Sequence, residues 1–351
     1  MLLSTAFSQV NRKRSKQTKQ KTVSQEVFKA ENGVLKSGIF HIRQSWSEET
    51  DYDRPVHIKV PHGDGPFPVS IMLHGRGGTG ARKLQAQRGM TDRIVIAPDG
   101  YKKGWSAQRP DVDFIRQLID NIAQDYEIDQ NRVYATGMSN GGYMAYELAC
   151  ELSDKIAAFG SVTGNFMLNE DQTCFFEKEI PILHIHGTND LVVDYYPPSF
   201  DGALTVSESI DYWNQVNQLN NLETETMSGS GGELSAEKFT YYRAGTDTEF
   251  IHYKVENGGH VWFGSPFVGP SVVNSSEILV EFFLNYALNE LPCLNPDGDI
   301  NDDGEINTFD FIQMLSNMSS LDDFDVNTCL DLNADNNIDI IDLIMISDLV
   351  F

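Results

Sequence analysis

A serine stands between glycines in the stretch Gly137-Met138-Ser139-Asn140-Gly141, where an apolar run ends and a helix-type pattern begins. The stretch is a Gly-x-Ser-x-Gly box, in which only small neighbours let a strand and a helix pass closely around a strained serine. The serine Oγ would lie near a helix N-terminus, whose N–H groups favour developing negative charge. The pattern therefore predicts a nucleophile at Ser139 rather than a structural turn.

A serine nucleophile needs a base, and in elbow-type folds the chain order is serine, acid, histidine. The histidines that follow Ser139 are His184, His186, His252 and His260. The first two lie inside the strand-like run "PILHIHG" and precede the best acid. His252 lies in the alternating run "EFIHYKV", whereas His260 lies in the glycine-rich loop "ENGGHVWFG" just after it. A loop histidine at the end of a strand can reach a nucleophile, so we predict His260 as the base, with His252 as the alternative.

The acid should orient the imidazole and stabilise its charged form. Asp190 ends the run "ILHIHGTND", at the carboxyl end of an expected strand, and Asp194 follows four residues later. Either residue could instead serve as a turn or capping residue. We predict Asp190 as the acid and keep Asp194 as the alternative.

An oxyanion hole needs two backbone donors. The residue after the nucleophile, Asn140, would supply one N–H group, and the loop "IMLHGRGGTG" would supply the other through Arg76 or Gly77. This loop lacks both Gly-x-Gly-x-x-Gly and the Gly-Lys-Ser/Thr ending of phosphate-binding loops. His74 in the same loop is expected to be a structural hydrogen-bonding residue.

These residues need a sheet to position them, and the sequence contains short apolar, β-branched runs that mostly end in Gly or Asp. The runs are "GIFHIRQSW", "RPVHIKVP", "FPVSIMLHG", "DRIVIAPDG", "NRVYATG", "AAFGSVTG" and "IPILHIHG". Helix-type segments between them are Asp111 to Tyr126, Gly142 to Leu152 and Val206 to Leu219. This alternation predicts a doubly wound α/β fold with a mostly parallel sheet and antiparallel opening strands. Functional residues are expected at the carboxyl ends of the parallel strands.

Charge is distributed unevenly along the 351 residues, whose net charge is −25. Residues 1–30 carry seven Lys or Arg and one Glu, whereas residues 291–351 carry 14 Asp or Glu and no Lys or Arg. We predict a remnant signal peptide and basic linker over 1–30, an enzyme domain over 31–290 and a separate module over 291–351. The net charge argues against nucleic acid or an anionic membrane as the main partner.

The chain is expected to be secreted. Its start, "MLLSTAFSQ", is similar to the end of a signal peptide, with a short apolar run before a small-x-small pattern. No stretch approaches the ~20 apolar residues that a membrane span requires. The four cysteines are not in Cys-x-x-Cys metal spacing, which favours two disulfides in an oxidising compartment.

Five motifs in order carry a resemblance to a known family: "LHGRGG", "APDG…GW", "RVYATGMSNGGYMAYELAC", "HGTND" and "NGGHVW". Residues 31–290 resemble the secreted esterases that include polyhydroxybutyrate-depolymerase-like enzymes and feruloyl or acetyl-xylan esterases. The resemblance implies an α/β-hydrolase fold without a large lid, a triad of Ser139, Asp190 and His260, and catalysis without a cofactor.

The same resemblance implies a disulfide between Cys150 and Cys174. It also places Trp105 and Trp262 near the acyl or polymer site, although ordinary core packing would explain both equally well.

The acidic segment 291–351 contains two runs of oxygen-bearing residues at loop positions 1, 3, 5, 7, 9 and 12, offset by 32 residues. Alternating oxygen ligands of this kind wrap one Ca²⁺ each, so we predict two structural calcium ions. The predicted ligands are Asp299, Asn301, Asp303, Glu305, Asn307, Asp310, Asp331, Asn333, Asp335, Asn337, Asp339 and Asp342.

Two such loop–helix repeats resemble a dockerin, a small all-α calcium-binding module that attaches enzymes to cohesin-bearing scaffold proteins. Position 12 is Asp here, whereas the ordinary EF-hand has Glu. The two repeats also differ at positions 10 and 11, with Thr308 and Phe309 in the first and Ile340 and Ile341 in the second. A bridge between Cys293 and Cys329 would staple the module.

The sequence thus predicts a secreted serine esterase that releases feruloyl or acetyl groups from plant cell-wall polysaccharide. A polyester depolymerase or oligomer hydrolase is the alternative within the same chemistry, and a serine peptidase is a weaker one. A non-catalytic, scaffold-bound binding protein is the alternative from another class, against which the complete Ser, Asp and His set argues.

Overall fold

The computed structural model describes the sheet domain and a few residues of the C-terminal segment. The described residues are 38–43, 53–63, 65–86, 90–106, 110–167, 174, 178–199, 203–266, 268–290, 306, 308, 311–312, 332 and 340–350. The predicted linker over 1–30 lies outside them.

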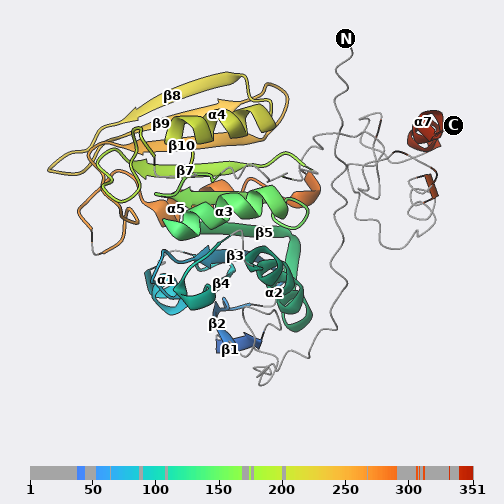
Figure 1. Cartoon of the computed structure of the whole chain (residues 1–351), viewed down its shortest axis with the longest axis horizontal. Coiled ribbons are helices and arrows are strands. Elements are labelled where there is room, and N and C mark those ends of the chain that lie inside the picture. Colours follow the sequence, from blue (N-terminus) through green and yellow to red (C-terminus); the bar gives the residue numbers. More distant parts are fainter. Residues whose placement is uncertain are drawn as a thin grey trace, which may run out of the picture.

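A ten-stranded sheet in the order β1-β2-β4-β3-β5-β6-β7-β10-β9-β8 organises the described residues (Figure 1). Strands β4, β3, β5, β6, β7 and β10 run parallel, while β1, β2, β9 and β8 complete the two edges with antiparallel pairings. The strands are β1 (Gly38–Arg43), β2 (Asp53–Lys59), β3 (Phe67–Leu73), β4 (Ile94–Pro98), β5 (Ile128–Met138), β6 (Ala158–Val162), β7 (Ile182–Gly187), β8 (Asn221–Met227), β9 (Ala236–Tyr242) and β10 (Glu249–Val255).

Helices cover both faces of this sheet (Figure 1). Large buried apolar residues of α2, α3 and α4 belong to one cluster, and those of α5, with Leu84 of α1, pack in a second cluster. The helical elements are α1 (Gly80–Ala86), η1 (Tyr101–Lys103), α2 (Asp111–Asp125), α3 (Asn140–Glu151), α4 (Val206–Val216), α5 (Ser275–Phe283), η2 (Leu288–Glu290) and α7 (Ile340–Val350).

Continuous apolar sequence in the central strands follows from this double covering. In β3 every residue is buried, with Val69, Ile71 and Leu73 in the first cluster and Met72 in the second. Successive side chains of a strand point to opposite faces of the sheet. A strand between two helix layers therefore needs apolar residues at both its odd and its even positions.

Local signals set the start of α4, the helix after the loop that carries Asp190. Thr205 accepts a hydrogen bond from the Glu208 N–H, and the Glu208 side chain bonds back to the Thr205 N–H. This reciprocal capping box satisfies two donors that would otherwise lack partners in the first turn.

The predicted parallel sheet with antiparallel opening strands is confirmed, and each strand and helix predicted within residues 31–290 is present. The helix predicted from Gly142 begins two residues earlier, at Asn140. Strands β8 and β9 and helices α1 and α5 were not among the predicted elements.

In the C-terminal segment, α7 buries Leu343 and Ile346 against Phe311, Leu332 and Val350. Among the described residues, no helix combines the length and the apolar character that crossing a membrane would require.

Candidate active site

Ser139 occupies the turn between β5 and α3 with backbone angles of φ 57° and ψ −123°. Positive φ is rare outside glycine and marks a position that the surrounding structure holds in place. Two groups hold it here: the Ser139 N–H donates to the Val162 carbonyl at 2.9 Å, and its carbonyl accepts from Gly142 and Tyr143. The predicted elbow geometry is therefore present.

The glycines on either side of Ser139 are required by close backbone contacts. A Cβ at Gly137 would lie 2.1 Å from the Gly141 carbonyl oxygen, and one at Gly141 would lie 2.4 Å from the Leu73 carbonyl oxygen. The Gly-x-Ser-x-Gly pattern thus reflects the crossing of β5, α3 and the end of β3 around the serine.

The loop after β3 packs directly against this serine. A Cβ built on Gly75 would lie 3.4 Å from Ser139 Cβ and 4.0 Å from Ser139 Oγ. Within the described residues, the N–H groups of Gly75, Arg76 and Asn140 donate to no acceptor. These three amides are therefore available to a substrate oxygen.

One of the predicted oxyanion donors is corrected by the structure. The Gly77 N–H donates to the Lys103 carbonyl at 2.7 Å, so it is already committed to holding the loop against η1. Arg76 remains a candidate donor, and Gly75, which the sequence reasoning did not select, joins it.

His74 holds this loop in the way expected of a structural hydrogen-bonding residue. Its Nε2 accepts from the Gly100 N–H at 2.9 Å, and its Nδ1 lies 2.8 Å from the Gly75 carbonyl oxygen. Burial lowers the pKa of His74. These contacts fit the neutral tautomer that carries its proton on Nδ1.

Asp190 and His260 meet in the loops after β7 and β10, at the same edge of the sheet as the elbow. His260 Nδ1 lies 2.7 Å from Asp190 Oδ2, while Asp190 Oδ1 accepts from the N–H groups of Val192 at 2.8 Å and Val193 at 2.9 Å. Asp190 is buried, whereas the His260 side chain is 17% exposed. With Nδ1 engaged by the acid, Nε2 is the nitrogen left to face a hydroxyl group. No hydrogen bond joins His260 to Ser139 among the described residues, and such bonds often tighten only when substrate binds.

Glycines also bring the loops of these two residues together. A Cβ on Gly187 would lie 2.2 Å from the Gly258 carbonyl oxygen, and the Asn189 N–H donates to that same oxygen at 2.8 Å. The loops after β7 and β10 are thereby fixed side by side, so Asp190 and His260 are positioned by backbone contacts as well as by their own hydrogen bond.

A second histidine contacts the acid. His186 Nε2 lies 3.3 Å from Asp190 Oδ2 and 2.9 Å from the Val193 carbonyl oxygen. The sequence pattern predicted His186 only as a strand residue. Its position four residues before Asp190, at the end of an apolar strand, is the signal that would have marked it as a neighbour of the acid.

Hydrogen bonds determine the charge state of Asp190. Burial alone would raise its pKa, but donors on His186, His260, Val193 and Val192 hold the pKa of this carboxyl well below its usual range. Asp190 is therefore ionised at neutral pH, as the predicted role requires.

Behind the acid lies a buried group of histidines. His186 Nδ1 is 3.3 Å from His184 Nε2, and the Tyr195 hydroxyl is 2.9 Å from His252 Nε2. Burial lowers the pKa of His184 well below its usual value and lowers the pKa of His252 to about 3. His252 lies buried within β10 and contacts neither Asp190 nor Ser139 through a hydrogen bond among the described residues, so the geometry favours His260 as the base.

The predicted substrate contacts of the two tryptophans are corrected by their burial. Trp105 is 4% exposed and donates its indole N–H to the His74 carbonyl, while Trp262 is 5% exposed and donates to Ser276 Oγ. The ring of Trp262 is also covered by the Lys83 ammonium group, whose Nζ lies 3.3 Å from the ring centre. Both indoles pack the walls of the site and leave almost no face for a ligand.

Asn140 connects the elbow to one of these walls. Its side-chain oxygen accepts from the Trp105 N–H at 2.8 Å, and its side-chain nitrogen donates to the Trp105 carbonyl at 3.0 Å. The segment from η1 to Trp105 is therefore fixed to the residue that follows the nucleophile.

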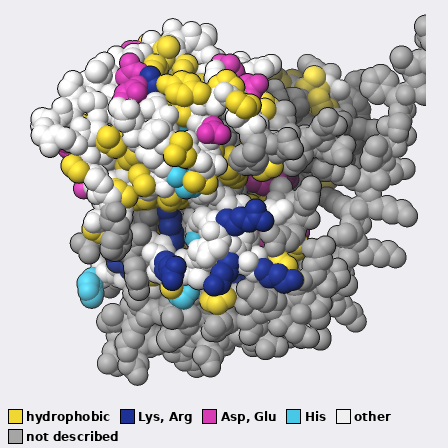
Figure 2. Space-filling view, turned by 60° about the vertical axis from the view of Figure 1, so that its left-hand side comes forward, with side chains coloured by type: hydrophobic (Ala, Val, Ile, Leu, Met, Phe, Trp, Pro, Cys, Tyr) yellow, Lys and Arg dark blue, Asp and Glu magenta, His cyan; other side chains and the backbone are white. Residues whose placement is uncertain are grey.

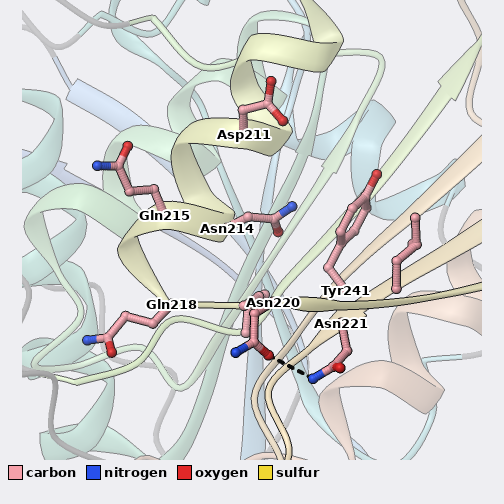
Figure 3. A pocket seen from close by; sticks show the side chains of 9 residues that line it. Asp211, Asn214, Gln215, Gln218, Asn220, Asn221 and Tyr241 are labelled. Carbon is pink, nitrogen blue, oxygen red and sulfur yellow. Dashed lines mark hydrogen bonds between the residues drawn. The ribbon is translucent and has the colours of Figure 1, made fainter.

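A separate open hollow of about 590 Å³ lies beside α4 and β8 (Figure 3). Amide side chains from both elements line it, together with Asp211 and Tyr241. None of the predicted catalytic residues reaches this hollow, so we do not assign the chemistry to it.

The disulfide implied by the family resemblance is present, since Cys150 and Cys174 are bonded. Cys293 and Cys329 lie outside the described residues, and so do most of the predicted calcium ligands. These are Asp299, Asn301, Asp303, Glu305, Asn307, Asp310, Asp331, Asn333, Asp335, Asn337 and Asp339. The remaining one, Asp342, is buried in the first turn of α7.

Comparisons with known proteins show the family to which the chain belongs. A family model described as Phospholipase/Carboxylesterase matches residues 109–235, a range that includes Ser139 and Asp190. The probable feruloyl esterase C of Aspergillus niger is 30% identical over 243 residues, which cover 65% of this chain and 81% of that protein. The chain belongs to the esterase family of this relative. Because of this family membership, the chain is a carboxylic ester hydrolase of the α/β-hydrolase superfamily.

The chain is also similar to proteins with other names. The bifunctional acetylxylan esterase/xylanase XynS20E of Neocallimastix patriciarum is 26% identical over 227 residues, 61% of this chain. This chain spans about a third of that relative, since the match covers 32% of its length. Among solved structures, an acetyl xylan esterase from Aspergillus awamori is similar at 16% identity and a TM-score of 0.49, covering 71% of this chain and 99% of that one.

Proposed function

We propose that this chain is a serine esterase that releases feruloyl or acetyl groups from cell-wall polysaccharide. The observation that carries the proposal is the 2.7 Å contact between His260 Nδ1 and Asp190 Oδ2, in loops that follow parallel strands at the same edge of the sheet as the strained Ser139 elbow. These are the three groups that acyl transfer through a serine requires.

In the proposed reaction, His260 Nε2 removes the Ser139 hydroxyl proton as Oγ attacks the ester carbonyl. The resulting imidazolium is stabilised by the ionised Asp190. His260 then donates the proton to the departing alcohol, which leaves an acyl group on Ser139 Oγ. A water molecule attacks this acyl-enzyme with His260 again as base, and the carboxylic acid is released.

Negative charge on the carbonyl oxygen would be stabilised by the Asn140 N–H together with the N–H of Gly75 or Arg76. These amides are fixed by the loop contacts of His74 and Gly77 before any substrate binds, so they need little reorganisation during the reaction. The loss of one such donor typically costs about 10²–10³ in rate.

An apolar surface for the acyl group is supported by the loop that follows the acid. Leu191, Val192 and Tyr196 are 83%, 65% and 57% exposed, although they are large apolar residues. Hydrogen bonds from the Val192 and Val193 N–H groups to Asp190 fix this loop beside the catalytic residues. Such a surface suits an aromatic acyl group better than a charged one.

The names of the relatives support the substrate class, since they include feruloyl esterase C and an acetylxylan esterase. The deciding experiment measures hydrolysis of methyl ferulate, acetylated xylan and polyhydroxybutyrate side by side, with Ser139→Ala as control. We expect turnover of the first two and none by the variant. Retained turnover in Ser139→Ala would exclude the mechanism, and preferential hydrolysis of polyhydroxybutyrate would assign a polyester depolymerase instead.

We also propose that the protein acts outside the cell. The proposal is supported by the Cys150–Cys174 disulfide, because structural disulfides persist mainly in oxidising compartments. An extracellular location also suits a polymeric cell-wall substrate.

The C-terminal segment is proposed to bind two Ca²⁺ ions and to dock onto a cohesin-type scaffold protein. Asp342 fits a calcium ligand by its place in the chain, because it is the carboxylate at position 12 of the second predicted loop and lies in the first turn of α7. Calcium would supply rigidity to the loops and no chemistry to the esterase site. The partner surface is supported by exposed apolar side chains on α7, namely Ile340, Ile341, Ile344 and Leu349.

A further inference from the structure

Four exposed cationic side chains lie in the segments that follow β3 and β4, whose carboxyl ends are at the same edge of the sheet as Ser139: Arg76 in the loop after β3, Arg82 in α1, and Lys102 and Lys103 in η1. We refer to these four residues as the basic rim. Within the described part of the chain, none of them is paired with a carboxylate. Figure 2 shows Lys and Arg side chains gathered on this face of the molecule, below a region richer in apolar side chains.

Most cations elsewhere in the described structure do have a carboxylate partner. The pairs are Arg54 with Asp111, Arg93 with Asp92, Arg116 with Asp154, Arg132 with Asp129, Lys155 with Asp120, Arg243 with Glu179, and Lys254 with Glu237 and Glu256. The chain has 51 Asp and Glu against 26 Lys and Arg, so carboxylates are plentiful. Some other cations in the described structure also lack a carboxylate partner there, but they are buried or half-buried, namely Lys59, Lys83 and Lys238. Among the described residues, the exposed cations without such a partner are the four of the basic rim.

Backbone contacts tie the basic rim to the nucleophile. Arg76 follows Gly75, whose Cβ position lies 4.0 Å from Ser139 Oγ. The Lys103 carbonyl accepts from the Gly77 N–H at 2.7 Å, which joins η1 to the loop that carries Arg76. The positions of these cations are thus linked to the same loop that offers the oxyanion donors.

The two lysines are held in a costly backbone conformation. Lys102 has φ 49° and Lys103 has φ 65°, in the left-handed region that residues other than glycine rarely occupy. Neighbouring contacts maintain it, with the Lys103 N–H bonded to the Gly100 carbonyl and the Gly104 N–H bonded to the Tyr101 carbonyl. Strain of this kind tends to persist where a structure places side chains for function.

The opposite side of the site has a different character. It is formed by the loop after Asp190, with its exposed Leu191, Val192 and Tyr196, and its exposed charge is the acidic Asp194. A ligand that spans the site would therefore meet apolar side chains on one side and unpaired cations on the other.

From this arrangement we infer that the basic rim binds carboxylate groups of the polysaccharide that carries the ester, so that the substrate is a uronic-acid-bearing polymer. The inference rests on the proposed esterase function and specifies the alcohol side of its substrate. Exposed guanidinium and ammonium groups bind carboxylates through charge-assisted hydrogen bonds. The net charge of −25 would repel polyanions at long range. Salt screens that repulsion beyond about 8 Å at physiological ionic strength, whereas the rim side chains would bind carboxylates by direct contact.

The test measures binding of fluorescein-labelled polygalacturonate to the full-length Ser139→Ala protein by fluorescence anisotropy. Unsubstituted xylan of similar length, labelled in the same way, is the neutral probe. A rim variant, Arg82→Gln/Lys103→Gln, is compared with a charge-matched control, Arg132→Gln/Lys155→Gln. The control residues belong to exposed or half-exposed ion pairs near the amino ends of β5 and β6, away from Ser139.

We expect polygalacturonate to bind more tightly than xylan and to bind less tightly in 500 mM than in 50 mM NaCl. The dissociation constant should rise about fourfold in the rim variant, since each of the two exposed ion pairs contributes a factor of about two, and less than twofold in the control. Equal binding of the two polymers, or equal effects of the two variants, would overturn the inference. Equally tight binding of a single-stranded oligonucleotide would overturn it too, since the rim would then be a general polyanion surface.

Hydrolysis by the corresponding variants with Ser139 intact separates this inference from the proposed function. Turnover of the small neutral ester 4-nitrophenyl acetate tests the esterase alone. If that turnover is absent, the proposed function fails, whereas the anisotropy result stands independently. If turnover is present but binding shows no carboxylate preference, only the polymer assignment fails.

Discussion

Asp190 receives hydrogen bonds from both neighbouring loops and from its own strand, through His260, His186 and the N–H groups of Val192 and Val193. A carboxylate held in this way is pre-oriented, so its catalytic contribution depends on its charge and on the tautomer that it imposes on His260. Replacement of Asp190 by a neutral residue of the same shape should therefore lower the catalytic rate far more than the free energy of unfolding.

We predict that Asp190→Asn lowers kcat for 4-nitrophenyl acetate by about 10⁴, because the amide favours the wrong imidazole tautomer. Asp194→Asn, four residues away and exposed, is the matched control and should leave kcat within twofold. Steady-state kinetics and thermal melting of both variants provide the measurement. A loss in Asp194→Asn that equals the loss in Asp190→Asn would reassign the acid.

Gly75 and Gly77 give a second contrast between neighbouring residues. A methyl group on Gly75 fits the protein, but at 4.0 Å from Ser139 Oγ it would occupy space that an ester needs. We predict that Gly75→Ala lowers kcat/KM by about 10–100-fold with unchanged melting, in line with the cost of disturbing one oxyanion donor.

Gly77→Ala should show the reverse pattern. Gly77 has φ 77° and open space around its Cβ position, so alanine there adds backbone strain and no steric clash. We expect a loss of about 1 kcal/mol in the free energy of unfolding and a small change in kcat/KM. Melting curves and kinetics of the two variants measure both quantities, and equal activity losses would argue against Gly75 as a wall of the site.

Local signals in the sequence were sufficient to predict Asp190 and His260 as neighbours and Ser139 at a strained turn, because chain order and strand ends restrict which residues can meet. They were insufficient for Gly77, whose N–H is engaged by the carbonyl of Lys103 in a distant segment. The same holds for Trp105 and Trp262, since their burial depends on the packing of helices and loops far apart in the chain.

At the scale of elements, β7 and β10 place three buried histidines side by side, behind the acid. His184 and His252 pair in register, and their rings lie 5.0 Å apart. Their burial prevents hydration of the charged forms, so the fold is compatible with them only as neutral groups.

We predict that the protein loses stability as the pH falls from 6.5 towards 4. In the unfolded chain a histidine binds a proton below about pH 6.5. In the folded protein the pKa of His252 is about 3, and that of His184 is also well below its usual value. The unfolded state therefore binds more protons throughout this range, and the free energy of unfolding falls by up to about 1.4 kcal/mol per pH unit for each histidine.

Thermal melting between pH 7 and pH 4 measures this effect, and His252→Gln should reduce the slope of Tm against pH. His62→Gln, at an exposed position, is the control and should leave the slope unchanged. Identical slopes in His252→Gln and the unsubstituted protein would contradict the prediction.

Strands at the edges of the sheet are not predicted by the alternation of apolar and polar residues alone. Strand β8, with the sequence "NLETETM", has five exposed residues in its centre, so it lacks the apolar alternation that predicts a strand. It forms because it pairs in register with β9 over all seven of its residues. Central strands such as β3 were predictable because both of their faces are buried.

At the scale of the whole molecule, the esterase site and the proposed calcium loops share no residue. All of the residues proposed for catalysis lie between Gly75 and His260, whereas the predicted calcium ligands begin at Asp299. The acidic composition of 291–351 predicted this division, although the arrangement of its loops lies largely outside the described residues.

We therefore predict that calcium affects the C-terminal segment and leaves ester hydrolysis unchanged. Ions that bind only the folded state stabilise it by mass action, by about 4 kcal/mol at a thousandfold excess over the dissociation constant. Limited proteolysis of the full-length protein should remove residues after about 290 in EDTA and spare them in millimolar Ca²⁺. Mg²⁺ should protect these residues poorly, because its smaller, octahedral coordination shell suits the loops less well. In both conditions kcat for 4-nitrophenyl acetate should be the same. Loss of hydrolysis in EDTA would mean that calcium supports the catalytic domain itself, and identical cleavage patterns with and without Ca²⁺ would remove the basis for the proposed docking module.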